Sequence, residues 1–299
     1  MKIVVNTPAG HVGRAIVERL LASRHTPVII SRHTAKVADL AERGAKIVKG
    51  SMDDPVVLDC AFKGADAVFW LTPITFDQLQ YVQWVHRTGE IAAECAKQHG
   101  VKRAVVLSTV GAQENSKSGL LECLWVVEQA FKKAVPNVTA LRPGAFMENF
   151  LNNVTSMAEA SCIFGRYPTT KRIPMVATCD VAALAEEILL DGDWRGFRVL
   201  ELHGPEDLNQ SRAAEIISEA LSRTVTYVEV TDAQAKQGML AAGMPPDLVE
   251  LMLGMYTELN AGRMEPEQPR SESTTTKTTL KQFAREVLKP AVESGVPAR

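Results

Sequence analysis

Short apolar runs alternate with longer amphipathic stretches along the first 145 residues. Six short, β-branched or aromatic runs are typical of buried strands; they lie at residues 3–5, 28–30, 46–48, 67–71, 104–107 and 138–141. Stretches with apolar side chains at helical spacing separate them; these cover residues 13–23, 35–43, 56–62, 76–99 and 120–134. Alternating strands and helices predict an α/β fold with a doubly wound parallel sheet that is buried on both faces.

The pattern changes after Pro143 and Gly144. A helix over 147–160 should precede a loop rich in Gly, Pro and Thr. Further strands are expected near 173–178, 197–202 and 225–230, and further helices near 181–191, 211–222 and 280–292. Two helices joined at 243–246 should fill residues 232–264, because Pro opens a helix well. We therefore expect a dinucleotide-binding domain at residues 1–145 and a smaller α+β cap at residues 146–299, with some cap strands joining the main sheet.

Composition and charge argue against several classes of function. The 299 residues are 46% hydrophobic and 23% charged, ordinary values for a globular protein. A net charge of −2 gives no support for nucleic-acid binding or for a polybasic membrane patch. No apolar run reaches the length of a membrane helix. The five cysteines are scattered without a CxxC pair, and the six histidines lack metal-ligand spacing, so we expect a cytoplasmic protein without a metal site.

A glycine-containing turn joins the first predicted strand to the first predicted helix. Residues 4–14 read Val-Val-Asn-Thr-Pro-Ala-Gly-His-Val-Gly-Arg. Gly10 and Gly13 keep the spacing of the last two glycines of a GxxGxxG dinucleotide turn, in which the helix N-terminus faces the pyrophosphate. A tight turn without ligand, with Gly13 serving only helix–strand packing, is the alternative.

Six segments in order resemble the NmrA-like family, an atypical branch of the short-chain dehydrogenase/reductases. The segments lie at residues 6–13, 71–73, 107–112, 141–150, 179–182 and 202–206. The resemblance implies a Rossmann-type fold that binds NADP or NAD. Some members reduce quinones, azo dyes or triphenylmethane dyes, and others sense the cofactor and regulate a partner protein.

The sequence departs from the family pattern in the turn. Thr7 and Pro8 stand where the family usually has Gly-Ala. Because proline lacks an N–H and restricts the residue before it, we expect an extended Thr7 and one fewer amide donor to the cofactor.

The end of the second strand favours NADP over NAD. An acidic residue there would bind the ribose 2′-OH of NAD, whereas this chain has Ser31, Arg32 and His33. The Arg32 guanidinium suits a 2′-phosphate, although an exposed surface arginine is the alternative. Ser51 replaces the family's adenine-side Asp, and Asp53 and Asp54 are interpreted as helix-start carboxylates.

Together the turn, the strand ends and the resemblance predict a set of ligand contacts. The predicted cofactor contacts are Asn6, Thr7, Ala9, Gly10, His11, Val12, Ser31, Arg32, Ser51, Met52, Leu71, Thr72, Pro73, Ser108, Gly144, Ala145 and Phe146. The predicted substrate-pocket residues are Thr109, Met147 and Asn149. For Ser108 and Asn149, backbone capping is the alternative. Asp180 is predicted to cap the helix that follows it.

The sequence does not identify catalytic residues. Short-chain reductases use a Tyr-xxx-Lys pair, but the pair Tyr167 and Lys171 lies in a loop with Pro168, so we interpret its spacing as accidental. Leu124 stands where relatives often carry a lysine, four residues before Glu128. Reduction of an activated acceptor still needs mainly orientation of the reactants, with water as proton source.

Two functions remain open. The first is NADPH-dependent reduction of a small activated acceptor such as a quinone or azo compound. The second is a non-catalytic NADP(H) sensor that regulates a protein partner. A homodimer is compatible with either function.

Overall fold

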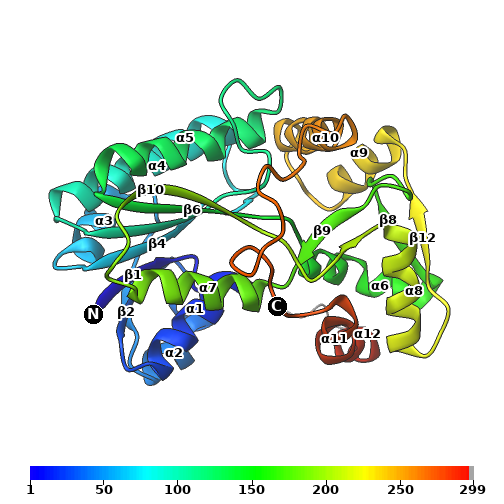
Figure 1. The fold of residues 1–299 in the computed structure, drawn as a ribbon, viewed down its shortest axis with the longest axis horizontal. Helices are drawn as coiled ribbons and strands as arrows, with labels where there is room; N and C mark the ends of the chain where they lie inside the picture. The colour runs from blue at the N-terminus through cyan, green and yellow to red at the C-terminus, as the bar shows by residue number, and fades with distance from the viewer. Residues whose placement is uncertain (296–299) are drawn as a thin grey trace. The chain divides into compact units, whose positions relative to one another are not determined.

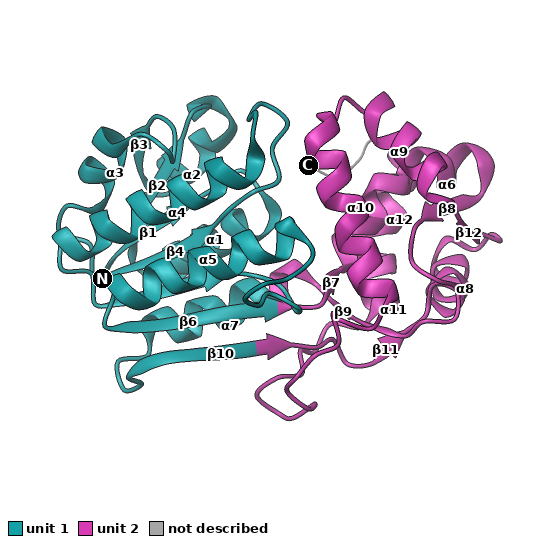
Figure 2. Ribbon diagram, turned by 90° about the horizontal axis from the view of Figure 1, so that it is seen from above, with its two compact units in different colours: residues 1–142, 181–200 teal, residues 143–180, 201–299 magenta. Residues whose placement is uncertain are grey.

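The computed structural model describes residues 1–295 and contains two compact units. Unit 1 comprises Met1–Arg142 and Val181–Leu200, and unit 2 comprises Pro143–Asp180 and Glu201–Arg299 (Figure 2). Helix α7 (Thr178–Leu190) and the following strand β10 (Gly196–Leu202) therefore fall largely in unit 1, although they come after the first segment of unit 2 in the chain. Each unit is described by itself.

Unit 1 is built on a seven-stranded sheet in the order β10-β6-β5-β4-β1-β2-β3. The strands besides β10 are β1 (Lys2–Asn6), β2 (Thr26–Ser31), β3 (Lys46–Lys49), β4 (Ala67–Leu71), β5 (Arg103–Leu107) and β6 (Asn137–Pro143). Val5 of β1 lies between Ile29 of β2 and Phe69 of β4, and all three side chains are fully buried. The order from β3 to β6 is that of the Rossmann fold, so the predicted doubly wound parallel sheet is confirmed.

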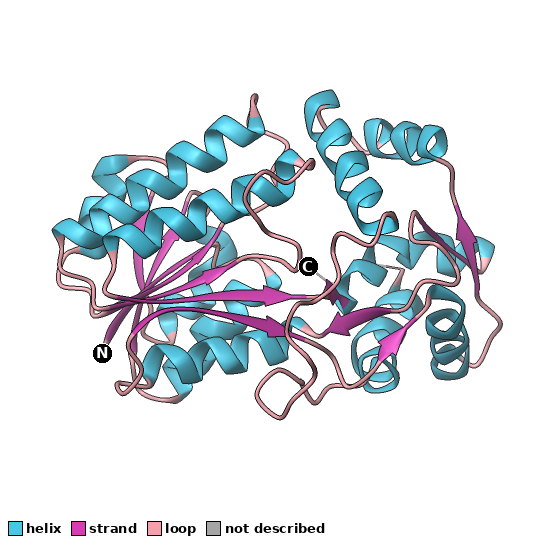
Figure 3. Ribbon diagram, turned by 45° about the horizontal axis from the view of Figure 1, so that its top comes forward, coloured by secondary structure: helices cyan, strands magenta, loops and turns pink. Residues whose placement is uncertain are grey.

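Helices cover both faces of this sheet (Figures 1 and 3). They are α1 (His11–Ala22), α2 (Ala38–Glu42), α3 (Pro55–Phe62), α4 (Tyr81–Gln98), α5 (Gly119–Ala134) and α7, with a short 3₁₀ helix at Thr34–Val37. Helices α4 and α5 pack side by side on one face, and α1 and α7 lie on the other. Buried apolar side chains on the inner side of each helix explain the arrangement, because they remove nonpolar surface from water.

Unit 2 contains two small sheets and a helical core. Strands β7 (Ala145–Phe146), β9 (Ile173–Val176) and β11 (Asp207–Leu208) form one sheet, and β8 (Cys162–Gly165) pairs in parallel with β12 (Thr226–Glu229). The helices are a 3₁₀ helix at Met147–Asn153, α6 (Val154–Ala160), α8 (Gln210–Leu221), α9 (Asp232–Ala241), α10 (Pro246–Asn260), α11 (Leu280–Phe283), a π-helix at Ala284–Leu288 and α12 (Lys289–Ser294).

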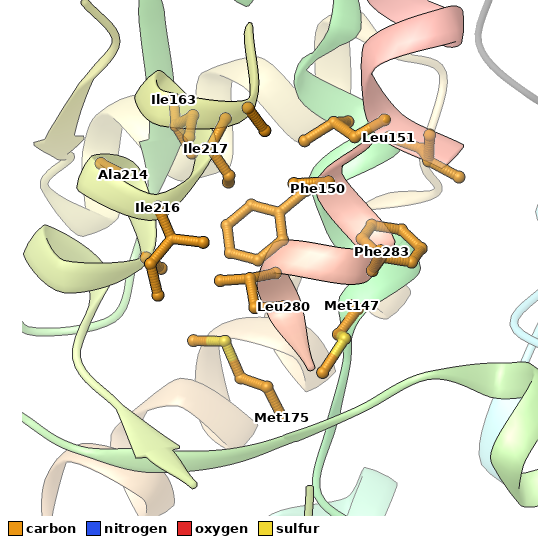
Figure 4. Close-up of a cluster of buried hydrophobic side chains, with 14 of the residues drawn as sticks. Met147, Phe150, Leu151, Ile163, Met175, Ala214, Ile216, Ile217, Leu280 and Phe283 are labelled. Carbon is orange, nitrogen blue, oxygen red and sulfur yellow. The ribbon is translucent and has the colours of Figure 1, made fainter. Parts of the chain in front are cut away.

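A cluster of buried apolar side chains forms the core of unit 2 (Figure 4). Phe150 packs among Leu280 and Phe283 from the C-terminal helices and Ile216 and Ile217 from α8. The cluster joins segments more than 130 residues apart in the chain, from Met147 to Phe283. The C-terminal helices are therefore an integral part of this unit.

Three element predictions were wrong in detail. The helix predicted from residue 76 begins at Tyr81, and residues 72–80 are irregular. The helix predicted over 147–160 is 3₁₀ up to Asn153 and α-helical only afterwards. The loop predicted after residue 160 contains strand β8, whose residues pair with those of β12 64 positions further along the chain, as in Cys162 with Thr226.

Candidate functional site

The turn between β1 and α1 places its two glycines in different environments. A Cβ on Gly13 would lie 2.2 Å from the Thr7 carbonyl oxygen, whereas a Cβ on Gly10 would meet only that oxygen, at an ordinary 3.6 Å. Gly10 also has an unstrained φ of −87°. Helix–strand packing therefore accounts for Gly13, as the alternative interpretation held. It does not account for Gly10, whose exposed backbone is open to a ligand.

Thr7 differs from the prediction. Its φ is +54°, in the left-handed region, instead of the extended conformation expected before Pro8. The Gly10 amide donates to the Thr7 carbonyl at 3.1 Å, which closes the turn and holds Thr7 in this conformation. A β-branched residue at positive φ is a genuine outlier. The tight turn thus overrides the local preference at a position where the family usually has glycine.

The N-terminus of α1 has the chemistry of an anion site. No side chain caps it within the described chain, and its first turn carries no acidic residue. The first amides of a helix lack intrahelical partners and carry partial positive charge. With Gly10 open, these amides can be approached by a pyrophosphate, as in other βα dinucleotide turns.

A pocket of about 240 Å³ adjoins this turn. Eight of the predicted cofactor residues line it: Thr7, Ala9, Gly10, Ser31, Arg32, Ser51, Met52 and Pro73. His33, considered beside Arg32, also lines it, and sequence reasoning missed seven others as contacts, namely Pro8, Ile30, Gly50, Thr75, Asp77, Gln78 and Trp84. Thr75, Asp77 and Gln78 lie in the irregular segment after Pro73, and Trp84 lies near the start of α4. A helix from residue 76 was predicted in this region, so no ligand contacts were expected there.

Arg32 forms an ion pair with Asp77 inside this pocket. The Asp77 carboxylate also accepts a hydrogen bond from the Thr75 hydroxyl. The Thr75 hydrogen bond and, next, Arg32 lower the pKa of Asp77, so it remains ionised. The pocket therefore has a guanidinium suited to a phosphate, with one carboxylate already beside it.

A small hydrogen-bond network joins two other residues of the pocket lining, Ser51 and Trp84, through Asp53. The Trp84 indole N–H donates to Asp53 at 2.8 Å, and Ser51 donates to the same carboxylate. Although burial raises the pKa of Asp53, these hydrogen bonds outweigh it and lower the pKa. Asp54 caps α3 as predicted, by accepting from the Val56 amide at 2.9 Å. Asp53 does not cap the helix; it positions Ser51 and Trp84 at the pocket wall.

Several predicted contacts do not line this pocket. Asn6 is fully buried, and its carboxamide makes two hydrogen bonds to the backbone of Leu71, at 2.7 and 2.9 Å. Its side chain therefore joins the ends of β1 and β4, and the predicted direct contact is replaced by a positioning role. Val12 is buried beneath the turn, and His11 is exposed at the start of α1.

Thr72 and Ser108 follow the adjacent strands β4 and β5. Both hydroxyl oxygens are buried without a hydrogen-bond partner in residues 1–295. The interpretation of Ser108 as a backbone cap was therefore wrong. Buried polar groups are normally paired. Unpaired hydroxyls at the carboxyl ends of two parallel strands lie at the edge where open α/β sheets bind ligands.

The remaining predicted contacts fall in unit 2, apart from Leu71 at the end of β4 and Thr109 just after β5, which lie in unit 1. Ala145, Phe146 and Asn149 line a second pocket, of about 300 Å³. Gly144 meets a packing requirement, since a Cβ there would lie 2.5 Å from the Pro174 carbonyl oxygen. Met147 is 1% exposed within the unit 2 core, so its assignment to a substrate pocket was wrong.

Two further predictions concern polar side chains. Lys171 pairs with Glu265 at 2.8 Å, and burial raises the pKa of Tyr167, so the two do not form a proton relay. Asp180 lies inside the first turn of α7 instead of capping it, and its carboxylate accepts hydrogen bonds from the backbone and hydroxyl of Thr278 at 2.8 and 2.9 Å.

Glu128, in helix α5, forms a buried ion pair with Arg142. Its carboxylate is fully buried and accepts two hydrogen bonds from the Arg142 guanidinium, at 2.9 and 2.7 Å. This bidentate pair ties α5 to the end of β6. The Glu128 carboxylate therefore has a structural role.

Neither a membrane span nor a metal centre is seen in the described part of the chain. None of its helices has both the length and the apolar character that a bilayer crossing requires. Residues 1–295 also contain no cluster of three or more His, Cys, Asp or Glu side chains that could bind a metal ion.

Comparison with known proteins supports the resemblance. An NAD(P)H azoreductase of Xenophilus azovorans is 30% identical over 254 residues, which cover 85% of this chain and 86% of that protein. An uncharacterized oxidoreductase of Bacillus subtilis (strain 168), YesF, is 27% identical over 285 residues, covering 91% of this chain and 92% of the relative.

Solved structures share the fold. The NADPH-dependent quinone oxidoreductase of Escherichia coli, complexed with NADPH, superimposes with a TM-score of 0.78 at 21% identity, covering 96% of this chain and 99% of that one. The triphenylmethane reductase of Citrobacter sp., complexed with NADP(H), gives 0.74 at 20% identity and covers 99% and 100%. The model of the NmrA-like family matches residues 1–284. This chain therefore belongs to the NmrA-like family.

Proposed function

We propose that the protein is an NADPH-dependent reductase of a small activated acceptor, such as a quinone or azo compound. The observation that carries the proposal is the unit 1 pocket, which brings the open backbone at Gly10 and the guanidinium of Arg32 to one site. The azoreductase of X. azovorans and the quinone oxidoreductase of E. coli support it by their names.

Different residues of the pocket would bind different parts of the cofactor. The backbone at Thr7, Ala9 and Gly10 and the first amides of α1, from His11 and Val12, would hold the pyrophosphate. Ser31, Arg32 and His33 would hold the 2′-phosphate, which makes NADP the preferred nucleotide and NAD the weaker one. The other proposed contacts in unit 1 are Ser51, Met52, Leu71, Thr72, Pro73 and Ser108.

When bound, the nicotinamide supplies a hydride, which carries two electrons and one hydrogen to the acceptor. Reduction of a quinone to a hydroquinone also needs one proton. Tyr167 and Lys171 do not form a proton-donating pair here. We therefore assign the proton to water, which suffices for an acceptor that is already electron-poor.

The test is NADPH consumption with a panel of quinones, azo dyes and aldehydes, with the reduced product quantified in each case. We expect one product molecule for each NADPH consumed with at least one quinone or azo compound, and no reaction with simple aldehydes, which need a general acid. If NADPH binds but no acceptor in the panel is reduced, the reductase proposal is wrong.

A cofactor sensor is the second candidate, and one feature favours it. The irregular segment at residues 72–80 exposes the apolar side chains of Ile74, Phe76 and Leu79 and also carries Asp77, which pairs with Arg32. A nucleotide that competes for Arg32 would release Asp77 and loosen the segment. Limited proteolysis with and without NADPH tests this: cleavage within 72–80 that NADPH does not alter would exclude the sensor.

A further inference from the structure

The second strand ends without an acidic residue, yet a carboxylate reaches the space beyond it from another part of the chain. Ser31, Arg32 and His33 stand where a dinucleotide site for NAD usually has an Asp or Glu. The Asp77 carboxylate, from the irregular segment after β4, contacts the Arg32 guanidinium and lines the same pocket. The pocket therefore contains a guanidinium suited to a phosphate and a carboxylate suited to a hydroxyl.

The Asp77 carboxylate keeps hydrogen-bonding capacity for a ligand. One of its oxygens accepts a hydrogen bond from the Thr75 hydroxyl, and the other accepts one from Arg32. An ionised carboxylate has about four lone-pair sites, so these two contacts do not exhaust it. Thr75 and, next, Arg32 lower the pKa of Asp77, which keeps the carboxylate in its accepting form. A hydroxyl that enters the pocket can therefore donate to Asp77.

The adenosine ribose is the part of a dinucleotide that would meet this carboxylate. Its 5′-oxygen leads to the pyrophosphate, which the open backbone at Gly10 would hold. Its 2′-oxygen would then lie beside Arg32, whether it carries a phosphate, as in NADP, or a hydrogen, as in NAD. Because Asp77 contacts Arg32, its carboxylate adjoins the same position.

The ion pair is weak enough to change with the ligand. Its side chains are about half exposed, and such pairs contribute little to stability. A phosphate monoester carries a charge of about −1.5 to −2 at neutral pH, so a 2′-phosphate would attract Arg32 and repel Asp77. A 2′-hydroxyl is neutral and would leave the pair closed.

We propose that Asp77 recognises the adenosine ribose of NAD, by accepting a hydrogen bond from its 2′-hydroxyl while remaining paired with Arg32. With NADP, Arg32 binds the 2′-phosphate and Asp77 withdraws. The pair thus accommodates both nucleotides, with NADP preferred, and residue 77 supplies the carboxylate that the end of β2 lacks. This role rests on the proposed function, because it needs a nucleotide in the unit 1 pocket.

The test is a thermodynamic cycle between the carboxylate and the hydroxyl. Calorimetric titration measures the binding of NAD⁺ and of 2′-deoxy-NAD⁺, which lacks only the 2′-hydroxyl of the adenosine ribose, to the wild type and to Asp77→Ala. The wild type should bind NAD⁺ about tenfold more tightly than the deoxy analogue, the loss expected for a hydrogen bond to a charged group. In Asp77→Ala the two affinities should agree within about twofold, because the partner of the hydroxyl is absent.

NADP⁺ gives a readout that a damaged pocket would not give. Asp77→Ala should bind NADP⁺ several-fold more tightly, because repulsion of the phosphate is removed, and NAD⁺ about tenfold more weakly. Asp59→Ala is the matched control: this carboxylate lies outside the pocket, next to His99, and all three affinities should stay unchanged. The titrations share one ionic strength, and circular dichroism confirms that both variants are folded.

Further outcomes distinguish the role of Asp77 from the proposed function. An equal preference for NAD⁺ over the deoxy analogue in the wild type and in Asp77→Ala would overturn the role of Asp77, even when NADP⁺ binds. So would weaker binding of both NAD⁺ and NADP⁺ by Asp77→Ala, or a wild type that binds NADP⁺ but not NAD⁺. Failure of the wild type to bind any of these nucleotides would overturn the cofactor site on which the proposed function depends.

Discussion

The guanidinium of Arg32, just after β2, is paired with the carboxylate of Asp77, 45 residues further along the chain. Both side chains are about half exposed, at 48% and 49%, so the pair contributes little to stability. Its importance lies in position, since both residues line the proposed cofactor pocket. Asp77 binds the Arg32 guanidinium, which is the group that would bind a 2′-phosphate.

Arg32→Ala should remove most of the preference for NADPH over NADH. A charge-assisted hydrogen bond to phosphate contributes roughly 1.5–3 kcal/mol, or about ten- to hundredfold in affinity. NADH has no phosphate there, so its affinity should hardly change. Both dissociation constants are measured at one ionic strength, because salt screens the interaction. Equal weakening of the two would mean that Arg32 supports the pocket without selecting the phosphate.

Asp77→Asn should increase the preference for NADPH over NADH. Removing the carboxylate frees Arg32 and eliminates repulsion of the 2′-phosphate, so NADPH should bind several-fold more tightly while NADH does not gain. Asp59→Asn is the control, because this carboxylate lies outside the pocket, next to His99. In the double variant Arg32→Ala/Asp77→Asn the gain should disappear, and its persistence would argue against competition for Arg32.

The two glycines of the turn should respond differently to substitution. Gly13→Ala should lower the free energy of unfolding by about 1–3 kcal/mol, because its Cβ would overlap the Thr7 carbonyl. Gly10→Ala should leave stability nearly unchanged, and Gly10→Asp should abolish NADPH binding by placing a carboxylate against the pyrophosphate. Urea unfolding and calorimetry measure the two effects. A folded Gly10→Asp variant with wild-type NADPH affinity would refute the cofactor site.

Thr7→Gly should stabilise the protein by about 1 kcal/mol. Threonine at φ +54° is strained by roughly 1–3 kcal/mol, and the larger entropy of glycine in the unfolded chain offsets part of the gain. Thr26→Gly, in ordinary strand conformation in β2, should destabilise and serves as the control. Thermal unfolding of both variants is the measurement, and a destabilised Thr7→Gly would show that the turn does not strain Thr7.

Glu128→Gln should destabilise the protein by about 3–5 kcal/mol, because it removes the charged partner from a buried bidentate ion pair. The exposed pair of Arg212 and Glu215 provides the comparison, and Glu215→Gln should cost less than about 1 kcal/mol. Denaturant unfolding measures both losses. Similar small losses in the two variants would contradict a structural role for the Glu128 contact.

The sequence by itself determined the doubly wound sheet, the glycine turn and several residues that line the unit 1 pocket. These features depend on local patterns. Short β-branched runs specify buried strands whatever surrounds them, and parallel strands end at a common edge. Consequently Gly10, Arg32 and Ser51 could be assigned to one pocket from their positions after β1, β2 and β3 alone.

Only the tertiary structure decided which side chains meet across the chain. The pairing of Arg32 with Asp77 and the burial of Met147 in the unit 2 core leave no periodic signal in the sequence. The conformation of Thr7 was also decided by its context, since closing the tight turn overrides the preference of a residue before proline. Local propensity amounts to about 1 kcal/mol or less per residue, and packing and turn closure readily exceed it.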